Sequence, residues 1–175
     1  VPTSLAVKAM RDNGYKNAAY AVAELMDNSI QAGATLVQLL CADRKTIVNQ
    51  RVRQSVDRVA VLDNGVGMDA ETLRIALQFG NGSRLAEGDW DGMGRFGMGL
   101  PSASISQCKR VDVWSWQEGP GSALHSYIDL GEIEAGTLKN LPEPTASEVP
   151  AFWKEAAEDE ELPESGTLVV WSKID

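Results

Sequence analysis

The chain has 175 residues, 43% of them hydrophobic, which suits one compact domain with a sizeable core. No apolar run approaches the roughly 20 residues of a membrane helix, and one His with two Cys cannot form a zinc site. The formal charge of −9 weighs weakly against nucleic acid binding. Without a secretory pattern at the N-terminus, we expect a cytoplasmic protein with no membrane contact, in which Cys41 and Cys108 are a buried thiol pair.

The negative charge is concentrated in one segment. Between residues 140 and 165 there are eight acidic residues and one Lys, a net charge of −7, which leaves −2 for the rest of the chain. This acidic insertion (139–165) is expected to be either a solvated loop or a surface for a partner. We expect the whole of 1–175 to be one domain, taken from a longer protein.

Hydrophobic spacing and turn residues predict the elements in chain order. The predicted helices span 2–12, 16–31, 70–79 (capped by Asp69), 100–107 and 150–158. The predicted strands span 35–42, 56–62, 111–116, 123–130 and 167–171, and a charged turn joins the first two. Because helices and strands alternate irregularly, we expect an α/β (α+β) sandwich with helices on one face of a mixed sheet.

The long helix 16–31 carries the first candidate site. Glu24 and Asn28 are four residues apart and share one helical face. A carboxylate in this place is suited to activating water, and the amide oxygen of Asn28 is suited to Mg²⁺. An ordinary solvated polar face would show the same pattern.

Two glycine motifs follow. The Asp63-Asn64-Gly65-Val66-Gly67-Met68 run comes directly after a strand, where a carboxylate can accept a hydrogen bond from an exocyclic amine such as that of adenine, although Asn-Gly also suits a hairpin turn. The glycine-rich run 80–99 ends in Gly94-Arg95-Phe96-Gly97-Met98-Gly99-Leu100, whose backbone amides at a helix start are suited to a polyphosphate. It is neither a Walker A loop nor a Rossmann motif.

These motifs, followed by Gly166-Thr167, occur in a fixed order from about Tyr20 to Trp171. In this order and spacing the chain resembles the GHKL (Bergerat-fold) ATPases, a superfamily that includes gyrase, heat-shock chaperones, histidine kinases and MutL. The wording of the motifs is most similar to MORC-like ATPases, with MutL and the chaperones next. The resemblance implies a two-layer sandwich with a mostly antiparallel sheet and an ATP lid at 80–96.

The resemblance also implies roles for individual residues. Glu24 matches the general base that polarises the attacking water, Asn28 the Mg²⁺ ligand, and Asp63 the acid that binds the adenine amino group, together with a water shared with Thr167. The implied ATP-binding residues are Asn28, Asp63, Gly65, Gly67, Met68, Leu77, Ser83, Gly94, Arg95, Phe96, Gly97, Met98, Gly99, Leu100 and Thr167.

Several functions fit this resemblance. We expect Mg²⁺-dependent ATP hydrolysis that drives lid closure and homodimerisation of a molecular clamp, with possible DNA contacts through other domains. The alternatives are a histidine-kinase-type phosphotransfer domain, for which Glu24 is unnecessary and His125 a poor acceptor, and a non-hydrolysing nucleotide sensor. Because relatives receive a γ-phosphate Lys from a following domain, we expect this domain alone to bind nucleotide better than it hydrolyses it.

Overall fold

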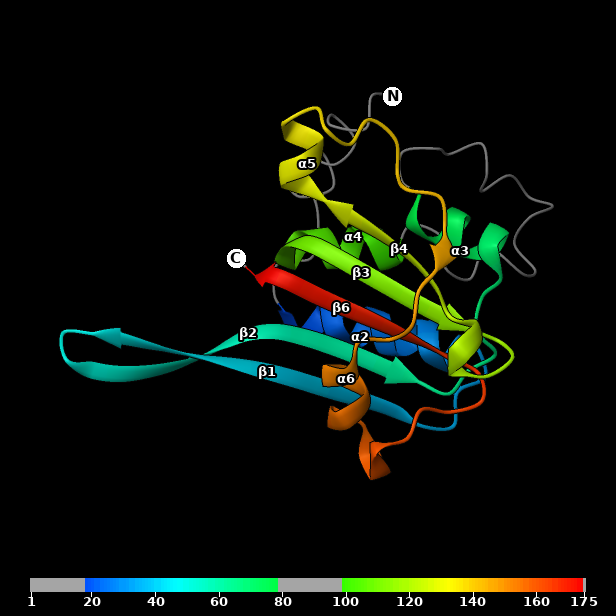
Figure 1. Cartoon of the computed structure of the whole chain (residues 1–175), viewed down its shortest axis with the longest axis horizontal. Helices are drawn as coiled ribbons and strands as arrows, with labels where there is room; N and C mark the ends of the chain where they lie inside the picture. Colours follow the sequence, from blue (N-terminus) through cyan, green and yellow to red (C-terminus); the bar gives the residue numbers. More distant parts are fainter. Residues whose placement is uncertain (1–17, 79–98, 175) are drawn as a thin grey trace.

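The computed structural model describes residues 18–78 and 99–174 (Figure 1). The predicted helix 2–12 and most of the glycine-rich run 80–99 lie outside these residues. The strands are β1 (Val37–Val48), β2 (Arg51–Asp63), β3 (Cys108–Trp116), β4 (Leu124–Asp129), β5 (Thr145–Ala146) and β6 (Gly166–Ile174). The helices are α2 (Ala18–Gln31), α3 (Ala70–Leu77), α4 (Gly99–Gln107), α5 (Leu130–Glu134) and α6 (Ala151–Ala156), with short 3₁₀ turns at Pro120–Ser122 and Glu158–Glu160. No helix within the described ranges is long and apolar enough to cross a membrane.

The strands form one sheet in the order β1-β2-β6-β3-β4-β5. Each pair of neighbouring strands described is antiparallel, so the α+β sandwich with a mostly antiparallel sheet is confirmed. The C-terminal strand β6 lies between β2 and β3, which brings residues from three distant parts of the sequence to adjacent positions.

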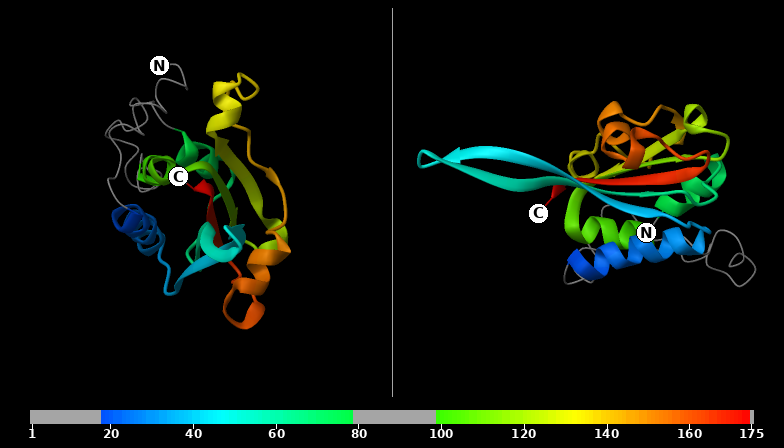
Figure 2. Two further views of the ribbon diagram at one scale, coloured as in Figure 1. Left: turned by 90° about the vertical axis from the view of Figure 1, so that its left-hand side faces the viewer. Right: turned by 90° about the horizontal axis from the view of Figure 1, so that it is seen from below.

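The main helices cover one face of the sheet. Figure 2 shows α2 and α4 side by side beneath the strands. Alternate strand residues point into the core between the two layers, because side chains of a strand alternate between its faces. This core includes Leu25, Leu73, Leu77, Ile105, Val111, Val113, Ile128, Val169 and Trp171.

The opposite face of the sheet is covered in part by the acidic insertion. Trp153 of α6 is only 2% exposed and packs with Val149 and Ala157 against strand residues such as Leu62 and Leu168. The carboxylates of the insertion remain at the surface, for example Glu155, Glu158 and Glu161. The insertion is therefore not only a solvated loop, since its apolar side completes a second core.

The charged segment between the first two strands is not a long turn. β1 and β2 continue through it as a ribbon, and only Asn49 and Gln50, with φ of 51° and 63°, form the turn (Figure 1). Alternating polar and β-branched residues favour strand structure here and outweigh the charges. The expectation of a buried thiol pair is also wrong, because Cys108 is buried while Cys41 on β1 is exposed.

Candidate functional site

A row of three polar side chains crosses the sheet on the face that the helices cover. The register pairs Asp63 of β2 with Thr167 of β6, and Thr167 with Ser115 of β3. Each lies two residues from a valine of the helix-side core, which fixes the face toward which it points (Val61, Val169 and Val113). All three side chains are buried, so this end of the sheet presents hydroxyls and a carboxylate toward α2.

Asp63 is held by donors from three directions. The Ser29 hydroxyl donates to Oδ2 at 2.7 Å, and the Gly65 amide donates to Oδ1 at 2.9 Å. Burial raises the pKa of Asp63, and the hydrogen bonds from Ser29, Gly65 and the Thr167 amide offset only part of that rise. An ionised carboxylate here is therefore poorly solvated, and a ligand that donates a further hydrogen bond would stabilise it.

Ser115 connects the row to the loop after β2. Its Oγ accepts a hydrogen bond from the Met68 amide at 2.7 Å and lies 2.8 Å from Thr167 Oγ1. Sequence reasoning missed Ser115, and it assigned no role to Ser29. A small polar residue within the apolar run of β3 was the available signal, but its partners are 47 and 52 residues away in the sequence.

Helix α2 contributes the polar residues above the row. Asn28 is 6% exposed and Ser29 4% exposed, whereas Asp27 is exposed. The Nδ2 atom of Asn28 is buried and has no hydrogen-bond partner among the residues that the structure describes. Glu24, one turn earlier, is half-buried. A solvated polar face does not account for Asn28, because a buried amide without a partner is costly.

The Asp63–Met68 segment is a loop between β2 and α3 rather than a hairpin turn. Asn64 fixes its start, since its Oδ1 accepts hydrogen bonds from the amides of Thr35 and Leu36 at 2.8 and 2.9 Å. Gly67 has φ of 72°, and a Cβ placed there would lie 2.1 Å from the Trp116 carbonyl oxygen. The glycine is thus needed for the close approach of the loop to β3.

Four of the predicted residues line a small cavity between α2, α4 and the sheet. It is lined by Asn28, Asp63, Leu100 and Thr167 with four further residues (Leu25, Ser29, Val61 and Val169). Its volume of about 10 Å³ is the space of about one water.

Other predicted site residues have different positions. Met68 and Leu77, each 1% exposed, belong to the helix-side core. Gly99 begins α4 and is followed by the buried Leu100. Six predicted phosphate-contact and lid residues lie outside the described residues, together with the lid 80–96 (Ser83, Gly94, Arg95, Phe96, Gly97 and Met98).

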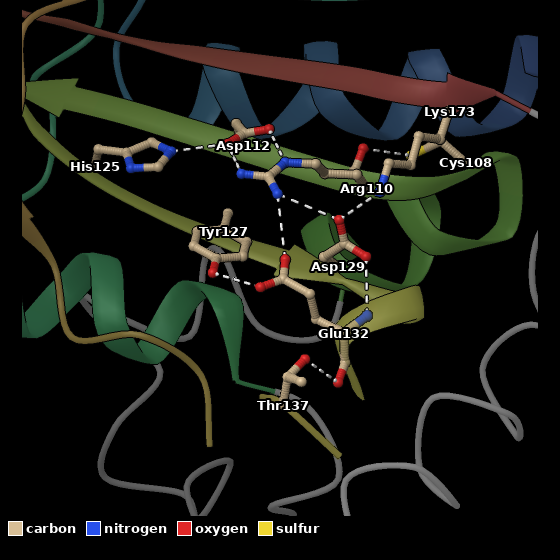
Figure 3. A network of polar contacts seen from close by, with 9 residues as sticks. All are labelled: Cys108, Arg110, Asp112, His125, Tyr127, Asp129, Glu132, Thr137 and Lys173. Atoms are coloured by element: carbon tan, nitrogen blue, oxygen red, sulfur yellow. Dashed lines mark hydrogen bonds and ion pairs between the residues drawn. The ribbon is translucent and has the colours of Figure 1, made fainter. Parts of the chain in front are cut away.

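A second polar cluster lies on the other face of the sheet, across β3 and β4 (Figure 3). Arg110 contacts Asp112 at 3.0 Å and Asp129 at 3.2 Å, and His125 Nε2 lies 2.8 Å from Asp112. Burial alone would raise the pKa of Asp112, but the hydrogen bonds from His125 and Arg110 outweigh it and hold the pKa below its usual value. His125 is thus engaged in the fold, and it lies on the face opposite Asp63.

The chain matches the family described as histidine kinase-, DNA gyrase B- and HSP90-like ATPase over residues 15–160. It therefore belongs to the GHKL ATPase family.

Two kinds of curated relative are similar to the chain. The ATPase MORC2B of Mus musculus is 32% identical over 125 residues, which is 71% of this chain and 12% of the relative. The DNA mismatch repair protein MutL of Caulobacter vibrioides is 28% identical over 139 residues, 75% of this chain and 20% of MutL. The chain thus spans a fifth or less of these relatives.

A solved structure shares the fold. The N-terminal domain of a DNA repair protein superposes with a TM-score of 0.57 at 18% identity, covering 96% of this chain and 41% of that one. At this identity the likeness concerns the fold alone.

Proposed function

We propose that this domain binds ATP between α2 and the row Asp63–Thr167–Ser115, and hydrolyses it with Mg²⁺. The observation that carries the proposal is the buried carboxyl of Asp63, which accepts hydrogen bonds from Ser29 and Gly65 beside the cavity. A buried acceptor of this kind fits the exocyclic amine of adenine, and in this proposal Thr167 would share a water with that carboxyl.

Glu24 and Asn28 are the residues that we assign to the phosphate end. They lie one turn apart on α2, so their side chains reach the same region above the sheet. Glu24 would accept the proton of the attacking water, and its half-buried position keeps it open to that water. Asp27 on the same helix is exposed and has no place in this assignment.

The described residues fit a magnesium ion that retains water and phosphate ligands. No group of three or more His, Cys, Asp or Glu within the described ranges could hold a metal by itself. Asn28 instead offers a single amide oxygen for the metal, while its Nδ2, a donor that is buried without a described partner, would suit a phosphate oxygen rather than the cation. Mg²⁺ is commonly bound through one or two protein oxygens plus phosphates, where it neutralises phosphate charge.

Binding and turnover are tested separately on matched variants. Glu24→Gln is expected to bind ATP within about threefold of the wild type and to lose turnover by about 10²- to 10⁴-fold, because only proton transfer is removed. Asp27→Asn, the same change in charge on the same helix, should alter neither. Asn28→Ala should weaken binding with Mg²⁺ and leave binding without Mg²⁺ nearly unchanged.

Turnover that survives in Glu24→Gln would contradict the assignment of the base. Acid-labile phosphate on a protein histidine, with no release of free phosphate, would instead favour phosphotransfer. Binding without turnover in the complete protein would favour a nucleotide sensor.

The larger role that we propose is that of an ATP-dependent clamp. The family description and the relative named ATPase MORC2B support ATP binding and hydrolysis, the activity on which such a clamp would depend. In the proposed cycle, ATP favours lid closure and pairing of two copies, and hydrolysis reverses both, because a ligand shifts a two-state equilibrium by its differential affinity. Sedimentation velocity with a non-hydrolysable analogue would detect the paired state.

A further inference from the structure

The outer half of β1 and β2 forms a two-stranded ribbon that leaves the body of the molecule, seen at the left of Figure 1 and again in Figure 2. We call residues 43–58 the ribbon. A shift in register at Ala42/Asp43 marks its start, and a β-bulge of this kind bends a strand pair away from its sheet. At its base, the Arg58 guanidinium lies 4.5 Å from the centre of the Phe152 ring of α6.

The ribbon has the opposite charge to the rest of the chain. It contains five basic residues (Arg44, Lys45, Arg51, Arg53 and Arg58) and two acidic ones (Asp43 and Asp57), a net charge of +3 in a chain of −9. An excess of basic charge on an exposed projection favours contact with a negatively charged partner.

The register places three of the five basic residues on one face of the ribbon. Arg44 pairs with Ser55, Thr46 with Arg53 and Val48 with Arg51, and positions two apart in a strand share a face. One face therefore carries three arginines with Thr46, Val48 and Ser55. The nearest acid, Asp57, is unpaired at the register shift at the base of the ribbon, where its Oδ2 lies 3.9 Å from Nε of Arg58. The other face carries Lys45, Ile47, Val52, Val56 and the pair Gln54–Asp43, whose atoms Nε2 and Oδ2 are 2.7 Å apart.

The three arginines have no described countercharge. Arg44, Arg51 and Arg53 are exposed, and none forms an ion pair with a residue that the structure describes. Seven residues of strand separate Arg51 from Arg58, about 23 Å at 3.3 Å per residue. This distance exceeds two Debye lengths of about 8 Å at physiological salt. Salt therefore screens the tip of the ribbon from most of the negative charge of the rest of the domain.

We propose that the arginine face of the ribbon binds the phosphodiester backbone of B-form DNA. The major groove of B-DNA admits a two-stranded β-ribbon, and arginine is the side chain best suited to phosphate oxygens. A two-stranded ribbon alone is marginally stable in water, and a partner along its length would order it. Twelve strand residues, about 40 Å, separate Arg51 from Asp63, so this surface is independent of the proposed nucleotide site.

The test measures binding of the chain to a fluorescein-labelled 30-base-pair DNA duplex by anisotropy, over a salt series from 50 to 200 mM. The variant Arg44→Gln/Arg51→Gln/Arg53→Gln is expected to bind at least tenfold more weakly. Its slope of log affinity against log salt should be shallower by about 2.7, because each lost phosphate contact contributes about 0.9. The charge-matched control Lys109→Gln/Lys139→Gln/Lys154→Gln should keep the wild-type slope.

Two further variants distinguish phosphate contact by the arginines from base recognition and from binding at the nucleotide site. The arginine-to-lysine triple variant should retain duplex binding, since phosphate contact needs charge more than a particular base edge. Asp63→Asn should also retain it, even if it abolishes nucleotide binding. Equal affinity and slope in the glutamine triple variant and the wild type would overturn the proposal.

Absence of duplex binding at 50 mM salt would overturn it as well. The proposal would also be overturned if the glutamine triple variant kept duplex binding and lost only self-association in sedimentation. That result would assign the ribbon to a contact with the acidic surface of a second copy. Equal binding of an RNA duplex of the same sequence would contradict the B-form assignment, because the major groove of A-form RNA is too narrow for the ribbon.

Discussion

Replacing Gly67 by alanine tests how tightly the loop after β2 is fitted to the sheet. The added Cβ would lie 2.1 Å from the Trp116 carbonyl oxygen, whereas ordinary contact begins near 3.4 Å, so the loop must move by about 1.3 Å. This movement would stretch the 2.7 Å bond from the Met68 amide to Ser115 Oγ to about 4 Å, beyond hydrogen-bonding distance.

The expected cost has two parts. An alanine in the left-handed region, which the φ of 72° requires, costs about 1–2 kcal/mol, and an unsatisfied buried amide costs about 1–3 kcal/mol more. Together they predict that Gly67→Ala lowers the free energy of unfolding by about 2–5 kcal/mol. The loss should also weaken ATP binding, because Ser115 holds Thr167 beside Asp63.

Gly33 provides a matched control for this change. It has φ of 80°, but a Cβ placed there meets nothing within 4 Å, so Gly33→Ala should cost only the backbone part, about 1–2 kcal/mol. Urea unfolding followed by circular dichroism measures both variants, and unchanged m values would show that the unfolded states are comparable. Equal losses in the two variants would refute the role of close approach at Gly67.

Two other predictions concern the face opposite the helices. Trp153→Ala should lower the free energy of unfolding by about 3–5 kcal/mol, because the side chain is 2% exposed, while Phe152→Ala, at a residue 45% exposed, should cost about 1 kcal/mol. The pKa of Asp112 is lowered in the folded chain, so the unfolded chain binds more protons in acid, and stability should fall as the pH drops below about 3.8. Asp112→Asn should make urea midpoints less dependent on pH there, and an unchanged dependence would contradict the role given to His125 and Arg110.

At the ends that carry site residues, the sequence predicted the bounds of the elements that build the site to within one residue. The helix ending at Gln31, the strand ending near Asp63 and the helix after Asp69 all occur. Local signals were strong in each case: helical spacing followed by Gly33, an apolar run before Asn-Gly, and a capping carboxylate that accepts from the Thr72 amide at 2.8 Å.

The sequence did not predict what depends on strand register. Ser115 and Thr167 meet because β6 lies between β2 and β3, and no local pattern encodes that order. The ribbon was predicted as a turn because its many charged residues were given more weight than the alternation of polar and β-branched residues along it. Likewise, the sequence did not predict that Trp153 packs against the sheet. The insertion is strongly acidic, and the neighbours of Trp153 lie on strands far away in the sequence.

Calorimetric titration with a non-hydrolysable ATP analogue, with and without Mg²⁺, tests the central claim most directly. The chain should bind the analogue in a Mg²⁺-dependent manner. Asp63→Asn should weaken binding by about 10- to 150-fold, the equivalent of about 1.5–3 kcal/mol for a hydrogen bond to a charged group. Asp57→Asn, the same substitution on the same strand at the base of the ribbon, should bind as the wild type does. Equal affinities in all three folded proteins would contradict an adenine site at Asp63.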